Sequence, residues 1–522
     1  MKILFVWPNL DQFGYKPLGI SILSSIAKKL GHQCELFQTS EIDFGFADNT
    51  QVGEEYKIFK PVDFSPYNVN KKRIDLEEHF TEIYNKFKPD CLAFSILSYE
   101  RIVAGELVEF ARKLNKDVPI IWGGKFPTLN PEKTLKTYDI DYLCIGEGLE
   151  AFPELLTAID EGRESNNLYN IWVRNNDKII KNVVRPLKEN LDNLPYFDWD
   201  IFDKRNFYKP FDGKIYVGGD HMLNWGCPNK CSYCINDSYH KLYKDTGFKI
   251  RRYSVKRIIK ELQYLINKFK IEFFTFHDEN FLVRPTENLR ELSKEYKEKV
   301  NVPFVIMTNA NSVNKKKVEF LKEMNCASVS IGIETGNTEL RKNILNRIES
   351  KKNIVNAFKI FKEIGIRTSS FNMMALPYET RKTYMDTVRL NREAQVQYPN
   401  NVFLFPFEGT KIREIAIKGG FFDPEGSDKE ALYSQIKPAL HFDNLTEGEL
   451  IEMRKVFVFY VKLPEIYELF IKRSEKLDDI GKKLRRILNQ IYEETVWKND
   501  GWFKDDGNQQ LYLTELNKIL SK

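Results

Sequence analysis

Short apolar runs alternate with longer amphipathic stretches along most of this chain, and this alternation is the feature that most constrains its fold. Such runs are typical of buried strands, and the stretches between them are typical of helices that cover a parallel sheet. In residues 1–190 the predicted strands are Lys2–Trp7, Gln33–Phe37, Cys91–Ile96, Pro119–Trp122 and Tyr142–Ile145. Helical spacing of apolar residues marks Leu18–Leu30 and Arg101–Leu114, whereas residues 41–75 are polar and irregular and are predicted to be an inserted loop. The pattern predicts an α/β fold that opens with a Rossmann-like domain.

A second series of strands and helices follows in residues 191–410. Its predicted strands are Val217–Asn224, Phe273–Phe276, Phe304–Met307, Ser328–Ile333, Ile366–Met374 and Val402–Phe405. Ser254 is the predicted N-cap of a helix over Val255–Lys268. This order predicts a partial (β/α)6 barrel of the TIM type, with its chemistry at the carboxyl ends of the strands. Residues 411–522 are predicted to be mainly helical, in Thr446–Tyr460 and Ser474–Tyr492.

Three of the seven cysteines, Cys227, Cys231 and Cys234, lie together in the segment GCPNKCSYC. Thiolates are soft ligands that favour iron–sulfur clusters or zinc. A structural zinc ion normally takes four ligands, so a zinc site here would need a distant residue such as His221 or His240. The spacing C-x3-C-x2-C, with Tyr233 just before the third cysteine, resembles the signature of the radical S-adenosylmethionine (radical SAM) family.

The resemblance implies a [4Fe-4S] cluster held by the three cysteines, with one iron left to bind S-adenosylmethionine. In that family the reduced cluster cleaves S-adenosylmethionine to a 5′-deoxyadenosyl radical. The resemblance further implies that Asp278 or Glu279 accepts from the methionine amine, that Glu334 contacts the ribose and that Arg347 meets the carboxylate. Asn372 and the ALPYET turn lie where further contacts usually arise. His277 is interpreted as a packed or hydrogen-bonded histidine rather than a proton carrier.

Glycine- and hydroxyl-bearing turns follow several strands of the first domain. The candidates are Ser95, Gly123, Gly124, Thr128, Gly146, Glu147 and Gly148. Ligands of open α/β sheets bind beyond the carboxyl ends of the strands, and glycine allows close approach there. The segments GGKFPTLNPE and DYLCIGEGLEAFPELL resemble the cobalamin-binding domain found ahead of many radical SAM domains. The D-x-H-x-x-G motif that supplies a histidine to cobalt in other cobalamin proteins is absent, as it often is in the radical family. A domain that has lost its cofactor is the alternative.

These resemblances predict a cobalamin-binding domain in residues 1–190, a radical SAM domain in 191–410 and a helical domain in 411–522. The first functional hypothesis is a cobalamin-dependent radical SAM enzyme that methylates an unactivated carbon. A radical SAM enzyme that performs a rearrangement, oxidation or cyclisation is the competing enzyme hypothesis. A zinc-stabilised binding protein is the alternative of another class.

Composition sets limits on partners and location. The net charge of +5 is small against 79 basic and 74 acidic side chains, so no nucleic-acid partner is expected. No apolar stretch reaches the length of a membrane span. The number of cysteines is odd and their spacing shows no regular pairing, which is expected of a protein in the reducing cytoplasm. The expected partners are a small-molecule or biosynthetic-intermediate substrate and a reductant such as flavodoxin or ferredoxin.

Overall fold

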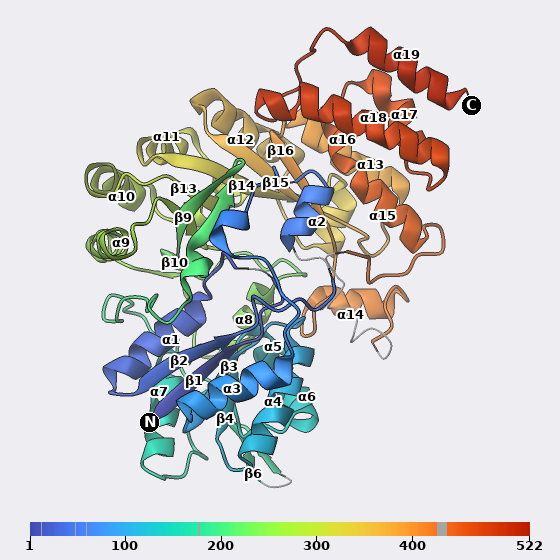
Figure 1. Ribbon diagram of the computed structural model, residues 1–522. Helices are drawn as coiled ribbons and strands as arrows, with labels where there is room; N and C mark the ends of the chain where they lie inside the picture. The colour runs from blue at the N-terminus through green and yellow to red at the C-terminus, as the bar shows by residue number, and fades with distance from the viewer. Residues whose placement is uncertain (12, 47–48, 59, 176–177, 425–435, 522) are drawn as a thin grey trace. The chain divides into compact units, whose positions relative to one another are not determined.

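The computed structural model describes residues 1–522 apart from residues 12, 47–48, 59, 176–177, 425–435 and 522. Contacts divide the chain into two units (Figure 1). Unit 1 comprises Met1–Asp48, Val62–Glu279 and Phe407–Arg413. Unit 2 comprises Asn49–Pro61, Asn280–Pro406 and Glu414–Lys522. The predicted domain limits at residues 190 and 410 stay a prediction.

The first sheet of unit 1 has seven strands in the order β2-β1-β3-β4-β5-β6-β7. They are β1 (Lys2–Trp7), β2 (Gln33–Gln38), β3 (Cys91–Ser95), β4 (Ile120–Gly123), β5 (Tyr142–Cys144), β6 (Ile171–Asn175) and β7 (Lys178–Ile180). Strands β1 to β5 are parallel, whereas β6 and β7 are antiparallel to their neighbours. Ile3 to Trp7 are all buried, as expected for a central parallel strand covered on both faces. The five predicted strands are confirmed to within two residues at each end.

Six helices accompany this sheet: α1 (Leu18–Lys29), α3 (Leu76–Phe87), α4 (Arg101–Leu114), α5 (Lys125–Leu129), α6 (Pro131–Thr137) and α7 (Gly148–Asp160). The chain moves from β1 to β2 in one direction and from β3 to β5 in the other. Right-handed crossovers therefore place α1 on one face and α3 and α4 on the other. The packing agrees, because α1 contacts α7 and α3 contacts α4. The strand order reverses between β1 and β3, and ligands of such sheets bind in the crevice at this switch point.

The rest of unit 1 carries the first strands of the second sheet. Strand β8 (Tyr208–Phe211) is antiparallel to β9 (Lys214–His221), which is parallel to β12 (Phe273–Phe276). The short strands β10 (Asn224–Trp225) and β11 (Arg251–Arg252) pair with each other, and the helices are α8 (Ile235–Leu242) and α9 (Val255–Phe269). The Ser254 hydroxyl accepts the Arg257 N–H at 3.2 Å, which confirms the predicted N-cap of α9.

Unit 2 contains the parallel strands β13 (Phe304–Thr308), β14 (Cys326–Glu334), β15 (Arg367–Met374) and β16 (Tyr398–Phe403). Their helices are α10 (Thr286–Lys299), α11 (Lys315–Glu323), α12 (Lys351–Ile364) and α13 (Arg381–Glu393). These four strands are neighbours in the order β16-β15-β14-β13 and alternate with helices, as the sequence predicts for this part of the chain. The predicted last strand, Val402–Phe405, is wrong in its bounds, because Pro399, Asn400 and Asn401 hide the start of β16 from the apolar pattern.

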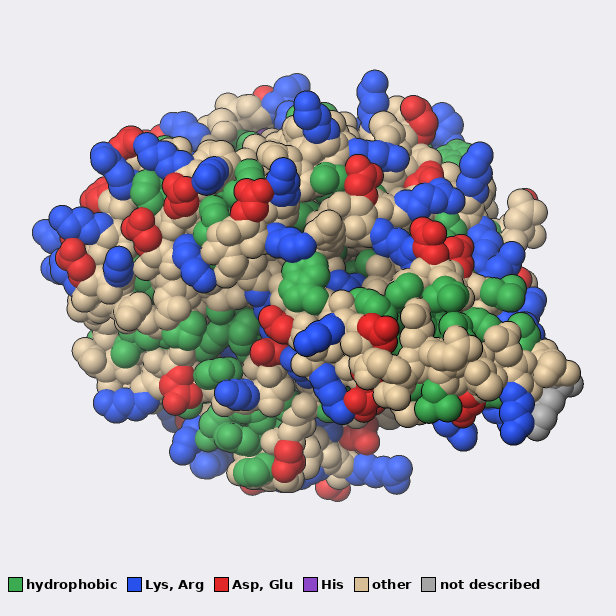
Figure 2. Space-filling model, turned by 90° about the horizontal axis from the view of Figure 1, so that it is seen from above, with side chains coloured by type: hydrophobic (Ala, Val, Ile, Leu, Met, Phe, Trp, Pro, Cys, Tyr) green, Lys and Arg blue, Asp and Glu red, His purple; other side chains and the backbone are tan. Residues whose placement is uncertain are grey.

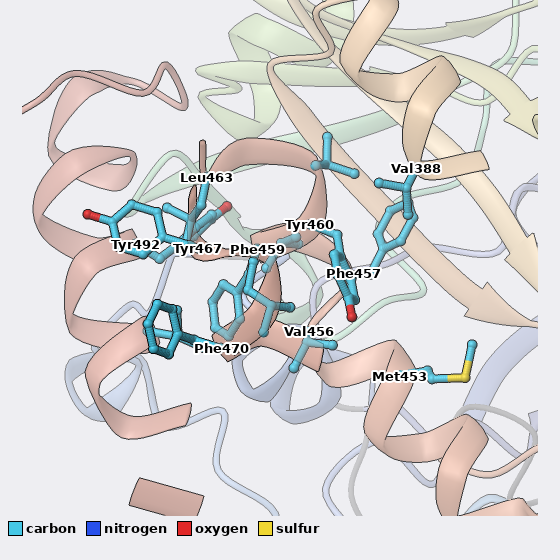
Figure 3. Packing of buried hydrophobic residues seen from close by; sticks show 14 of the residues in the cluster. Val388, Met453, Val456, Phe457, Phe459, Tyr460, Leu463, Tyr467, Phe470 and Tyr492 are labelled. Carbon is cyan, nitrogen blue, oxygen red and sulfur yellow. The ribbon is translucent and has the colours of Figure 1, made fainter. Parts of the chain in front are cut away.

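The C-terminal region is helical, as the sequence predicts. Its helices are α14 (Lys411–Lys418), α15 (Glu447–Lys455), α16 (Phe457–Lys462), α17 (Glu468–Ser474), α18 (Asp479–Thr495) and α19 (Gln509–Leu520). The first five residues of helix α16 are buried, in an apolar cluster to which Phe457, Phe459, Tyr467 and Phe470 belong (Figure 3). Each fully buried side chain of this size stabilises the fold by about 1.5–3 kcal/mol.

The predicted loop at residues 41–75 is wrong in part, because it contains the helix α2 (Asn49–Glu55), which belongs to unit 2. Glu55 pairs with Lys455 at 3.3 Å and Lys57 with Glu493 at 2.8 Å. The Arg454 guanidinium lies 4.2 Å from the centre of the Tyr56 ring. This excursion is therefore held by the C-terminal helices.

Basic and acidic side chains are interspersed on the face seen in Figure 2, in keeping with the small net charge. Among the described residues, no helix combines the length and the apolar character that a membrane crossing requires.

Candidate functional site

The three clustered cysteines lie on the loop between β10 and α8 in unit 1. Cys227 and Cys231 are buried and Cys234 is half-buried, and among the described residues none of the three forms a disulfide. The Cys234 N–H donates to the Cys231 carbonyl at 3.0 Å, and Asn236 Nδ2 donates to Cys234 Sγ at 3.5 Å. Tyr233 is half-buried within the same turn. Three thiol donors on one sheltered loop suit a cluster that takes three cysteine ligands.

The two histidines of the zinc alternative have other partners. His240 Nε2 lies 2.9 Å from the Cys227 carbonyl, and the centre of its ring lies 3.9 Å from that of the Phe248 ring, with the two planes tilted by 39°. His221 is fully buried, with Nε2 3.2 Å from a Glu261 oxygen. In the described part of the chain no three His, Cys, Asp or Glu side chains are gathered around a point that could hold one metal ion. A structural zinc ion would need a fourth ligand about 2 Å away, and both histidines that could supply it have the contacts given above.

The predicted cobalamin turns are joined by Thr128. Its hydroxyl donates to the Gly124 carbonyl at 2.8 Å and accepts the Gly146 N–H at 3.0 Å. Gly124 has φ +103°, and a β-carbon there would lie 2.7 Å from the Ile96 nitrogen. Gly146 has φ +73°, and its β-carbon would lie 2.2 Å from the Tyr243 oxygen. Glycine is required at both turns.

These turns border a cavity of about 320 Å³ beyond the carboxyl ends of β1, β3, β4 and β5, at the switch point of the sheet. The predicted residues that line it are Ser95, Gly123, Gly124, Gly146, Glu147, Gly148 and Glu279. The rest of the wall is largely apolar, from the first turns of α1 and from Trp225, Gly226, Asn236 and Tyr239 around the cysteine loop. The position of this cavity at the switch point and its glycine edges suit the cobalamin that the sequence predicts for this domain.

Glu147 lines this cavity and is also held by a buried ion pair that the sequence did not reveal. Its carboxylate accepts two bonds from the Arg251 guanidinium, at 3.0 and 2.7 Å. Arg251 also donates to the Lys188 carbonyl at 2.8 Å, and the Glu147 N–H donates to Tyr243 Oη at 2.8 Å. The pair ties the turn after β5 to β11, beyond the cysteine loop. No local sequence signal marks Arg251, since 104 positions separate it from Glu147.

Asp278 and Glu279 follow β12 and play different parts. The buried Asp278 carboxylate accepts the N–H groups of Leu223 and Asn224 at 2.9 and 2.6 Å, which fixes the chain that enters the cysteine loop. Glu279 is exposed to the cavity that it lines, and the surrounding walls, which keep part of the solvent away, raise the pKa of its carboxyl. Of the two, Glu279 is the one that faces open space, and the assignment of the methionine amine stays a prediction.

His277, which precedes them, is hydrogen-bonded as the sequence suggested: its Nε2 lies 2.6 Å from Asp220 Oδ1. Asp220 is fully buried and pairs with Lys209 and with Lys16, the latter at 3.1 Å. Burial opposes ionisation of Asp220, but the two lysines hold its pKa well below its usual range. Burial also lowers the pKa of Lys16 to about 8.

In unit 2, Glu334 and Arg347 are brought together at the end of β14. Arg347 Nη1 donates to Glu334 Oε1 at 2.9 Å, and Nη2 donates to Glu349 Oε1 at 2.9 Å and to the Gly332 carbonyl at 3.0 Å. Burial opposes ionisation of Glu349, but the Arg347 guanidinium lowers its pKa. Glu349 was not among the predicted residues, although its position two residues after Arg347 is a visible signal.

Asn372 is fully buried and its amide group has protein partners. Its Nδ2 donates to Ser370 Oγ and to the Asn400 carbonyl, both at 2.8 Å, while its Oδ1 accepts from Asn391 at 2.8 Å. In the following ALPYET turn, Ala375 and Tyr378 have φ values of +58° and +66°. Strained backbone of this kind gathers at functional sites, but the substrate contacts predicted here stay a prediction.

Two family models match the chain. The model of the radical SAM superfamily matches residues 225–390, and that of the B12 binding domain matches residues 12–156. An uncharacterised methyltransferase of Pyrococcus horikoshii is 25% identical over 74% of this chain and 81% of its own length. The anaerobic magnesium-protoporphyrin IX monomethyl ester cyclase of Rubrivivax gelatinosus is 23% identical over 81% of this chain and 75% of its own.

Solved structures share the fold. The radical S-adenosylmethionine methyltransferase TsrM of Kitasatospora setae, with cobalamin and a [4Fe-4S] cluster bound, gives a TM-score of 0.60 at 15% identity over 94% of this chain and all of that one. The cobalamin-dependent S-adenosylmethionine radical enzyme OxsB gives 0.65 at 14% identity, over 100% of this chain and 75% of that one.

The two domain models imply a [4Fe-4S] cluster, S-adenosylmethionine and cobalamin as the cofactors. The cysteine loop suits the first of these and the cavity beyond the sheet suits the last. The chain is therefore a cobalamin-binding radical SAM enzyme.

Proposed function

We propose that this enzyme methylates an unactivated carbon of a small-molecule substrate. The single observation that carries the proposal is that one cavity of unit 1 touches both the glycine turns and both ends of the cysteine loop. Trp225 and Gly226 lead into Cys227, and Asn236 follows Cys234 closely, and all three line the cavity with Gly123 and Gly146. A methyl carrier bound there would lie beside the cluster ligands.

When bound, the cluster supplies the electron that cleaves S-adenosylmethionine, and cobalamin supplies the methyl group. The chain's own residues position and shelter these groups. Cys227, Cys231 and Cys234 would hold the cluster, Asp278 fixes the entry to their loop, and the Glu147–Arg251 pair holds the loop against the cobalamin turns.

For S-adenosylmethionine, Glu279, Glu334 and Arg347 remain the proposed contacts of the amine, the ribose and the carboxylate. Arg347 can offer a guanidinium to a carboxylate only by sharing it with Glu334 and Glu349, since both already accept from it. Asn372 and Tyr233 are proposed to support the same cofactor. A flavodoxin or ferredoxin is proposed as the electron donor.

The test is to reconstitute the protein without oxygen and to follow S-adenosylmethionine labelled in its methyl group. The proposal expects the label on the substrate, with S-adenosylhomocysteine and 5′-deoxyadenosine formed together. Cys231→Ala is the matched control: it should retain the fold and produce no 5′-deoxyadenosine, because the cluster has lost one of its ligands.

The second candidate function is a radical cyclisation, oxidation or rearrangement without methyl transfer. It is favoured by the similarity to the cyclase of Rubrivivax gelatinosus. If the enzyme has this function, 5′-deoxyadenosine should form with unlabelled product and without S-adenosylhomocysteine. The same experiment therefore separates this function from methyl transfer.

A further inference from the structure

An open pocket of about 390 Å³ in unit 2 has no part in the chemistry described above. Its walls come from α12, from the end of α13, from the end of α16 and from the chain before α19. The charged side chains that line it are Lys362, Arg392, Lys462 and Glu465. Three cations therefore share this pocket with one acid, and the Glu465 side chain is 86% exposed.

Both lysines lie against one aromatic ring. The ammonium groups of Lys362 and Lys462 are 4.7 and 4.9 Å from the centre of the Trp502 ring. The positive charge of Lys362 lowers the pKa of Lys462, so the two ammonium groups repel each other, while each is attracted to the face of Trp502.

Lys462 is half-buried in the wall of the pocket. Its Nζ donates to the Val396 carbonyl at 2.8 Å, and among the ion pairs of the described residues none joins this ammonium to a carboxylate. Burial, and then Lys362, lower the pKa of Lys462 to about 7. A sheltered ammonium is costly unless it is paired with an anion.

Arg392, the third cation of the pocket, is held in place by contacts with the protein. Its guanidinium donates to the carbonyls of Tyr460 and Leu463 and lies 3.5 Å from Glu465 Oε1. These bonds hold the end of α16 against α13, so the pocket is built on two helices and not on mobile side chains alone. Leu463 and Tyr460 lie in the packed cluster of Figure 3.

We propose that this pocket binds a phosphate group, free or esterified, between the ammonium groups of Lys362 and Lys462. A phosphate group carries about −1.5 to −2 charges near neutral pH, enough to balance both lysines, and lysine is a common phosphate ligand. The site is independent of the proposed methyl transfer, because it lies on residues that hold none of the cofactors.

The experiment is isothermal titration of the reconstituted full-length enzyme with inorganic phosphate and, separately, with AMP. Saturable binding of either probe is expected. Tighter binding of AMP assigns an esterified ligand, whereas equal affinities assign free phosphate. Lys362→Met and Lys462→Met should each weaken binding about tenfold or more, because each removes a charge-assisted bond. Lys352→Met, on an exposed position of the same helix α12, should bind as the parent does.

Sulfate, which does not titrate near neutral pH, provides a second and independent measurement. Its affinity should fall as the pH rises from 6 to 9, since the pKa of Lys462 lies at about 7 and its ammonium loses a proton over this range. The other charged groups that line the pocket with Lys462 are Lys362, Arg392 and Glu465. Lys362 is exposed, so its variant folds whatever Lys462 contributes to packing. No saturable binding of phosphate or AMP at millimolar concentration, or equal binding by the parent and both pocket variants, would overturn the proposal.

Discussion

At the scale of single residues, the two adjacent glycines at the end of β4, Gly123 and Gly124, differ in whether a β-carbon could be added. A β-carbon at Gly124 would lie 2.7 Å from the Ile96 nitrogen at a φ of +103°, whereas one at Gly123 would meet Cys144 at an ordinary 3.7 Å. Gly124→Ala should therefore cost about 1–3 kcal/mol of unfolding free energy through backbone strain. It should also lower the cobalt retained per chain after desalting.

Gly123→Ala is the matched control and should change both quantities little. Equal loss of cobalt in the two variants would mean that the space beside Gly123, and not the turn at Gly124, decides how the cofactor is held.

Glu379, in the turn after β15, is expected to make the free energy of unfolding depend on pH. Burial raises the pKa of its carboxyl from 4.5 to about 8, and the carboxyl accepts the Leu376 N–H at 3.3 Å. The folded chain therefore binds one more proton than the unfolded chain between these pH values, so this group makes the free energy of unfolding fall as the pH rises from 5 to 8.

Glu379→Gln, which is neutral throughout, should remove this part of the slope. The variant should gain stability relative to the parent between pH 5 and pH 8 in urea unfolding. A constant difference across that range would show that Glu379 is ionised in the folded protein.

At the scale of elements, Asp278 links β12 to the chain that enters the cysteine loop through the N–H groups of Leu223 and Asn224. Asp278→Asn replaces one accepting oxygen by a donor that faces another donor, which typically costs about 1–3 kcal/mol. We expect lower iron content after reconstitution and a lower melting temperature. Asp245→Asn, at an exposed position after α8, is the control and should reconstitute fully. Full iron content in Asp278→Asn would contradict a role in shaping the loop.

Much of the fold could be predicted because strands with buried apolar runs are legible in the sequence. Strands β1 and β12 are examples, since Ile3 to Trp7 are all apolar or aromatic and three of the four residues of β12 are phenylalanine. The first half of strand β16 could not be predicted, since Pro399, Asn400 and Asn401 follow its first residue and are not typical of a strand. Its neighbour β15 supplies the pairing that the local sequence does not favour.

The parts of the candidate site that depend on a local motif could be predicted from the sequence. The cysteine spacing and the turns at Gly124 and Gly146 are motifs of this kind. The Glu147–Arg251 pair could not be predicted, because its two halves become neighbours only when the sheet and the cysteine loop have folded. The same holds for the phosphate pocket, whose lysines come from α12 and α16.

At the scale of the whole molecule, each of the two units is made of three separate segments of the sequence. Residues 49–61 leave the N-terminal sheet and join unit 2, where the Tyr56 ring is buried beneath Arg454. Tyr56→Ala should destabilise unit 2 by about 3 kcal/mol, the cost of removing a large buried side chain. Iron and cobalt content should be kept, because the cysteines and the cavity belong to unit 1.

Chemical unfolding followed by tryptophan fluorescence, alongside metal analysis, measures both effects. Tyr56→Phe, which keeps the ring, should be close to the parent. Loss of cobalt from Tyr56→Ala without a change in stability would assign this excursion to the cofactor domain.

The central claim is that cobalamin in this enzyme carries a methyl group. The most direct measurement supplies the reconstituted, reduced protein with S-adenosylmethionine labelled in its methyl group and then identifies the cobalamin that it holds. We expect labelled methylcobalamin, close to one equivalent per chain, even before the substrate is known. Unlabelled cobalamin, in a protein that still cleaves S-adenosylmethionine to 5′-deoxyadenosine, would contradict methyl transfer and leave the non-methylating radical reaction.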